Sequence, residues 1–136
     1  YENLTSARFD MSIFDIEVNG ESKDSSHGKG YRAYLNAVVM LMLRKYFAAY
    51  AKYNPRMFII DTPLHGFDEG LDETAPESMR TALFQYFINH QDEGQLIVIE
   101  NLDHIPHLQY EEAGVKVTKF VKGREDGRYG FLNDVI

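Results

Sequence analysis

The chain has 136 residues, of which 44% are hydrophobic and 13% aromatic, and its 14 basic and 21 acidic residues give a net charge of −7. This composition excludes intrinsic disorder, and the length is sufficient for one domain with its own hydrophobic core. The acidic balance argues against nucleic-acid wrapping by this chain alone, and the absence of cysteine excludes zinc fingers, disulfides and thiol catalysis.

The sequence has no sign of membrane insertion or secretion. Its longest apolar run, Ala37–Leu43, is far shorter than the roughly 20 residues that a membrane-spanning helix needs. The chain opens with Tyr-Glu-Asn-Leu and lacks the basic and apolar segments of a signal peptide. We therefore expect a cytoplasmic fragment or processed chain with no membrane partner.

The first 30 residues predict strands followed by a loop. Apolar and polar residues alternate from Arg8 to Val18, with a break at Phe14 that indicates a bulge or bend between two short strands. Residues 19–30 are rich in glycine and serine and nearly free of apolar side chains. Such a segment is typical of a turn or a binding surface.

A long helix is predicted over Tyr31–Tyr53, where apolar residues recur at helical spacing. The Asn54-Pro55 pair ends it. Its middle is apolar on most sides, so we expect the helix to be largely buried. Its aromatic residues are expected to lie in the core or to cover a neighbouring element, namely Tyr46, Phe47 and Tyr50.

Two short apolar runs predict buried parallel strands. Met57–Ile60 is followed by Asp61, and Leu96–Ile99 is followed by Glu100 and Asn101. Strands that alternate with helices favour a parallel sheet with right-handed crossovers. In such sheets, function gathers at the carboxyl ends of the strands, where these acidic and amide side chains stand.

The intervening helix is predicted to begin at a capping box, Thr74-Ala75-Pro76-Glu77, and to run to about Asn89. Near the C-terminus, alternation over residues 115–120 predicts an antiparallel strand. We therefore expect residues 1–136 to form a single α/β domain, with a mostly parallel sheet, flanking helices and a small antiparallel β tail.

An apolar strand that ends in Asp61 has the Walker B pattern. A carboxylate at a buried strand tip can hold Mg²⁺ beside a nucleotide phosphate. Taken alone the pattern is weak, because many α/β strands end in an aspartate that serves only the following turn.

Three further segments strengthen this interpretation. Asp61-Thr62-Pro63-Leu64-His65-Gly66-Phe67-Asp68 has the layout of a Walker B motif and D-loop, Ser26-His27-Gly28-Lys29-Gly30 that of a signature loop, and residues 95–101 that of a switch strand. From about Phe9 to His104, the sequence resembles the C-terminal half of an ABC-type ATPase head. The nearest group is that of the coiled-coil SMC and RecN-like proteins.

This resemblance implies a composite site for ATP and Mg²⁺ in a dimer of heads. Asp61 would organise Mg²⁺, and Asp68 would lie at the dimer seam. The γ-phosphate of ATP on the opposite head would be capped by the signature loop, through Ser26, Gly28, Lys29 and Gly30. The implied partners are an N-terminal Walker A lobe of the same protein, a second head and, through the full-length protein, DNA. The implied processes are DNA repair, chromosome maintenance or anti-phage defence.

The sequence departs from the family pattern at several positions. It has no Walker A loop, because Lys23 stands where that motif needs its first glycine. Thr62 replaces the usual glutamate that activates water, and Asn101 replaces the switch histidine. The Asn101 amide can still donate a hydrogen bond to a γ-phosphate, although it carries no charge. We expect Glu100, rather than Glu69, to act as the substitute base, and we expect the isolated chain to be nearly inactive.

Two other interpretations stay open. A degenerate lobe that binds nucleotide or protein without turnover would account for the departures at Thr62 and Asn101. A metal-dependent hydrolase would use a carboxylate and imidazole groups, namely Asp61, His65, His104 and His107.

Overall fold

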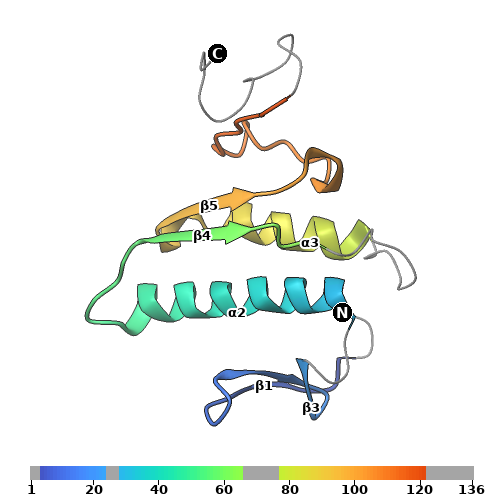
Figure 1. The fold of residues 1–136 in the computed structure, drawn as a ribbon. Coiled ribbons are helices and arrows are strands. Elements are labelled where there is room, and N and C mark those ends of the chain that lie inside the picture. The colour runs from blue at the N-terminus through green and yellow to red at the C-terminus, as the bar shows by residue number, and fades with distance from the viewer. Residues whose placement is uncertain (1–3, 24–27, 66–76, 122–136) are drawn as a thin grey trace, which may run out of the picture. The chain divides into compact units, whose positions relative to one another are not determined.

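The computed structural model describes residues 4–23, 28–65 and 77–121. The chain divides into two compact units, Tyr1–Pro106 and His107–Ile136. The helices and strands reported below all belong to the first unit (Figure 1). The described residues contain no helix long and apolar enough to cross a membrane.

The N-terminal segment folds locally into an antiparallel sheet. It consists of β1 (Ala7–Asp10), β2 (Asp15–Val18) and β3 (Glu21–Ser22), in that order. Asn19 and Gly20 join β2 to β3 with φ values of 55° and 83°, the left-handed pair that suits a two-residue hairpin turn. The predicted break at Phe14 is confirmed, since residues 11–14 form the turn between β1 and β2.

The predicted long helix is present as α2 (Lys29–Tyr50). It contacts β2 and also β4 (Met57–Asp61), and the Phe47 ring stacks on Phe58 with centroids 6.1 Å apart. The chain returns from α2 to β4 through a short connection, so the helix and the strand run in opposite directions (Figure 1). The start of α2 therefore lies toward the carboxyl end of β4.

The two predicted parallel strands pair with each other. β4 lies beside β5 (Gln95–Ile99), with Met57 opposite Gln95 and Asp61 opposite Ile99. They are linked by α3 (Glu77–Asn89) and the 3₁₀ turn η1 (Gln91–Glu93), which form one crossover connection. A second 3₁₀ turn, η2 (Leu102–His104), follows β5.

The prediction of a mostly parallel sheet is wrong. The described residues contain two helices, a three-stranded antiparallel sheet and a separate two-stranded parallel sheet. The physical reason is connectivity, because among the described elements β4–α3–β5 is the strand–helix–strand unit whose two strands pair, whereas β3 and β4, which flank α2, lie in different sheets. The earlier strands are joined by tight turns and pair with one another instead.

Burial also differs from the expectation for β4 and β5. Phe58 and Ile60 are buried on one face of β4, whereas the opposite face of the pair is open. The open sheet face consists of four apolar side chains that are 38–53% exposed, namely Met57, Ile59, Ile97 and Ile99. The prediction that these strands are covered on both faces is therefore wrong for this chain by itself.

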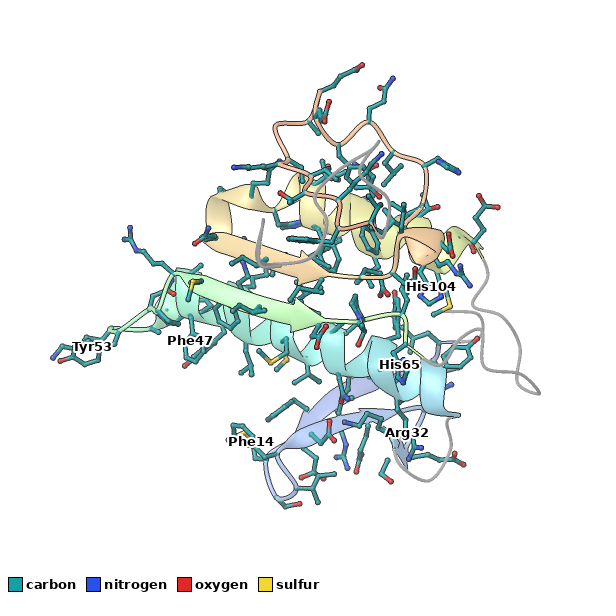
Figure 2. All side chains as sticks on the ribbon, turned by 45° about the horizontal axis from the view of Figure 1, so that its top comes forward. Phe14, Arg32, Phe47, Tyr53, His65 and His104 are labelled. Carbon is teal, nitrogen blue, oxygen red and sulfur yellow. The ribbon has the colours of Figure 1, made fainter. Side chains whose placement is uncertain are left out.

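Two further expectations need correction. The sequence predicts that three aromatic residues of α2 lie in the core or over a neighbouring element. Phe47 is half-buried and stacks on Phe58, whereas Tyr46 and Tyr50 are 55% and 78% exposed and so do not lie in the core. Figure 2 shows Tyr53, just after α2, pointing outward. The strand predicted over residues 115–120 is not formed, and only Phe120 takes part in an isolated bridge. The capping box lies partly outside the described residues, because they resume at Glu77.

A buried arginine ties α2 to the connection before β5. The Arg44 side chain is 1% exposed and donates hydrogen bonds to the carbonyls of His90 (2.8 Å) and Gly94 (2.5 Å). It also lies 3.4 Å from a carboxylate oxygen of Glu93, whose side chain is 10% exposed. A buried charge needs such partners, so these contacts fix η1 against the helix.

Replacing Arg44 with methionine should lower the free energy of unfolding by about 3 kcal/mol, because Glu93 would remain buried without its partner. The measurement is urea denaturation followed by circular dichroism. The matched control is Lys45→Met at the exposed neighbouring position, which should change stability by about 0.5 kcal/mol or less. Equal effects of the two substitutions would contradict the assigned role of Arg44.

Gly94 is required where the crossover enters β5. Its φ of 103° and ψ of 177° belong to a region that is nearly exclusive to glycine, and a Cβ here would lie 2.9 Å from the Arg56 carbonyl oxygen. Gly94→Ala should cost about 3 kcal/mol of stability. Gly20→Ala, with positive φ but open space around the new methyl, should cost about 1 kcal/mol. Thermal or urea unfolding of both variants measures the difference, and its absence would count against the close packing of Arg56 on Gly94.

Candidate functional site

The carboxyl ends of β4 and β5 form one edge of the parallel pair, and both end in acidic side chains. Asp61 is the last residue of β4, and Glu100 directly follows β5. The ladder continues one step further, because the Thr62 N–H donates to the Ile99 carbonyl at 2.8 Å. The predicted convergence of these two residues at a common edge therefore occurs in the structure.

Asp61 and Glu100 have opposite environments. The Asp61 residue is exposed, and its carboxylate makes no hydrogen bond or ion pair within the described parts of the chain. The Glu100 side chain is 2% exposed. Its Oε2 accepts from the Leu64 N–H at 2.9 Å, while its Oε1 accepts from the Asn101 N–H at 2.8 Å and lies 3.1 Å from Nδ1 of His104. Of these two carboxylates, Asp61 is therefore the one without contacts among the described residues.

The loop after Asp61 holds an unusual backbone conformation. Thr62 has φ of +46°, a left-handed value that is rare for a β-branched residue and costs on the order of 1–3 kcal/mol. Pro63 and Leu64 are fully buried, and the His65 N–H donates to the Thr62 carbonyl at 3.0 Å. Packing and hydrogen bonds thus maintain the strained turn. The polar residues and the proline of this segment indicate a loop, but they do not indicate the left-handed conformation of Thr62.

Asn101 lies at the surface beside this loop. Its side-chain oxygen accepts from the Asp103 N–H at 3.3 Å and so caps η2. The expected phosphate contact of Asn101 is not tested by these contacts. They do show that its amide oxygen has a local structural role.

The start of α2 contains the described part of the predicted signature loop. Gly28 occupies the cap position without a side-chain hydrogen bond, and Gly30 is buried in the first turn. Because the first amides of a helix lack intrahelical partners, this end carries partial positive charge. Lys29 is the first helical residue. Ser26 and Asp68 lie outside the described residues.

Within one copy, the start of α2 and the tip of β4 are far apart. Measured from the stacked Phe47–Phe58 pair, Lys29 lies about 27 Å along the helix, at 1.5 Å per residue. Asp61 lies about 10 Å along the strand from the same pair. Figure 1 shows α2 continuing beyond the arrowhead of β4. One phosphate group therefore cannot contact both segments of the same copy.

The histidines do not form a metal centre within the described residues, where no group of three or more histidine, cysteine, aspartate or glutamate side chains is placed to hold an ion. Figure 2 labels His65, which is exposed on the loop after β4, and His104. Nδ1 of His104 lies 3.1 Å from the Glu100 carboxylate. His107 belongs to the second compact unit. The contacts of His104 are those of a structural partner of Glu100.

Comparison of the chain with protein-family models, curated proteins and solved structures finds no match.

Lys23 links β2 to α2 through its side chain. Its Nζ lies 2.6 Å from the Asp15 carboxylate on β2 and donates to Oδ1 of Asn36 on α2 at 2.6 Å. Burial raises the pKa of Asp15, but hydrogen bonds from Lys23 and from the Ile16 N–H, together with the charge of Lys23, outweigh burial and keep this pKa below its usual value. The ion pair therefore joins β2, Lys23 and α2.

A carboxyl group whose pKa is lowered by folding contributes stability above its unfolded pKa, and the contribution is lost as the pH falls through the folded pKa. Asp15→Asn should therefore lower the free energy of unfolding by up to about 1 kcal/mol at pH 7. The deficit should shrink as the pH falls below about 4. Urea titrations at pH 7 and pH 3 measure this, with the exposed Asp92→Asn as the control. A deficit that does not change with pH would contradict the assigned ion pair.

Proposed function

We propose that this chain contributes half of an ATP site of the ABC-type, SMC-like kind, in a protein that binds and hydrolyses ATP with Mg²⁺. The observation that carries the proposal is the exposed carboxylate of Asp61, without a partner among the described residues, at the carboxyl end of a parallel strand pair. The resemblance of Asp61–Asp68 and Ser26–Gly30 to the motifs of that family supports it.

The donor set suits magnesium. Mg²⁺ is commonly held by one or two carboxylates together with phosphate oxygens and water, rather than by a cage of protein side chains. Asp61 would supply such an oxygen, and the bound ion would neutralise charge that develops on the transferred phosphoryl group. The chain's own contribution is to hold the Asp61 carboxylate at the strand tip, where it is exposed.

The proposed partners are a Walker A lobe of the same protein and a second head. The open sheet face supports the first, since parallel sheets are almost always covered on both sides. The distance between the start of α2 and Asp61 supports the second. Because one phosphate cannot reach both segments in one copy, a site that uses both needs two copies in a dimer.

The proposed cellular role follows from the family resemblance. An SMC-like ATPase of this kind would act in the cytoplasm on DNA through the full-length protein, in repair, chromosome maintenance or anti-phage defence. ATP would hold two heads together, and hydrolysis would release them, so the nucleotide would shift the protein between two states.

The burial of Glu100 favours a second candidate function, nucleotide binding without turnover. Thr62 carries no carboxylate, and Glu100 is 2% exposed with both oxygens already in hydrogen-bond contact. A general base must reach the proton that it removes, directly or through one water. In this candidate, the dimer would respond to ATP binding alone.

The test is ATP binding and hydrolysis by the intact protein with and without Asp61→Asn. The substitution should lower Mg²⁺-dependent turnover by about 100-fold, because the ion would lose its carboxylate oxygen. A 100-fold loss corresponds to about 2.7 kcal/mol of activation free energy. Asp92→Asn, an exposed carboxylate on η1, is the matched control and should retain wild-type turnover.

The outcomes separate the candidates. Binding of Mg²⁺-ATP without turnover by the wild-type protein would favour the non-hydrolysing lobe. Failure of the intact protein to bind Mg²⁺-ATP would reject the ATP site altogether. Hydrolysis of another substrate that needs Zn²⁺ or Mn²⁺ but not ATP would support the metal-dependent hydrolase.

A further inference from the structure

The Glu100 side chain connects the end of β5 to the loop that follows Asp61. Its Oε2 accepts a hydrogen bond from the Leu64 N–H at 2.9 Å, although 36 positions separate the two residues in sequence. Leu64 is only 1% exposed, so solvent does not compete for this bond. A carboxylate on one strand end thus holds the backbone that leaves the neighbouring strand end.

The second oxygen of the same carboxylate is held from the other side. Oε1 accepts from the Asn101 N–H at 2.8 Å and lies 3.1 Å from Nδ1 of His104, one turn further along the chain. The His104 side chain is 19% exposed. Burying a carboxylate is costly unless hydrogen bonds replace its water, and these contacts supply that replacement.

The loop between Asp61 and Leu64 is consequently fixed at both ends. The Thr62 N–H donates to the Ile99 carbonyl at 2.8 Å, and the Leu64 N–H donates to Glu100 at 2.9 Å. Between these bonds, Thr62 adopts its left-handed φ of +46°. Asp61 immediately precedes this restrained segment. The bond between Leu64 and Glu100 therefore restrains the backbone on the C-terminal side of Asp61.

We propose that Glu100 and His104 are positioning residues for Asp61, and that Glu100 is not the general base. This inference rests on the proposed function of Asp61 as the magnesium-holding carboxylate. Glu100 acts through the Leu64 N–H, and His104 acts by holding the Glu100 carboxylate. Through these contacts, β5 and η2 fix the position of the end of β4 at which the metal ion would bind.

The test is Glu100→Gln in the intact protein, with two readouts. The amide of glutamine has one accepting oxygen, so it cannot accept from both Leu64 and Asn101 with the geometry of the carboxylate. Hydrogen exchange at the Leu64 amide should become about tenfold faster. The Mg²⁺ concentration for half-maximal ATP turnover should rise about tenfold, a change typical of a lost outer-shell contact. The turnover rate at saturating Mg²⁺ should stay within about threefold of wild type.

Substitution of a general base and substitution of a positioning residue affect the Mg²⁺ dependence of turnover differently. If Glu100 were the base, Glu100→Gln would lower the turnover rate by about 100-fold or more at every Mg²⁺ concentration. That result would overturn the proposal, and so would unchanged exchange at Leu64. His104→Gln gives a second, milder variant that should shift both readouts in the same direction. Asp92→Asn should shift neither.

Measurements on the wild-type protein and on Glu100→Gln separate the ATP-binding function from the positioning role of Glu100. A wild-type protein that shows no Mg²⁺-dependent ATP binding or turnover would reject the function, and the positioning role would be rejected with it. A wild-type protein with normal Mg²⁺-dependent turnover, alongside a Glu100→Gln variant with unchanged Mg²⁺ dependence, would overturn the positioning role alone.

Discussion

The register of β4 against β5 is the constraint on which the candidate site depends. Parallel pairing places Asp61 opposite Ile99 and so brings the two strand ends to one edge. Successive side chains in a strand point to opposite faces, so a slip of one residue would exchange the covered and open faces. Backbone hydrogen bonds beyond the strands hold the register at both ends, from Gln95 to Arg56 and from Thr62 to Ile99.

The sequence pattern was sufficient for the elements that form around one clear periodicity. The helical spacing after residue 30, the two short apolar runs and the break at Phe14 each correspond to an observed feature. The parallel pairing could also be predicted, because a helix separates the two runs. The sheet architecture could not, since the Asn19–Gly20 turn pairs the first strands locally, and periodicity contains no information about which strands become neighbours.

Side-chain environments at the site were harder to predict than the elements. The acidic residues at the strand ends gave no indication that Asp61 would be exposed and Glu100 buried. That difference arises from the Leu64 N–H, whose approach depends on the tertiary course of the loop. Likewise, Arg44 has the spacing of a core position in its helix, and only the folded chain shows that its guanidinium donates to the carbonyls of His90 and Gly94.

The open sheet face has a consequence for the life of the polypeptide after synthesis. Its four branched or sulfur-containing side chains lie side by side on a flat, strand-forming surface, the kind of surface on which proteins aggregate and which chaperones recognise. While this face is exposed, the chain is at risk of binding other proteins non-specifically. Exposure of the face therefore works against persistence of the chain in the cell.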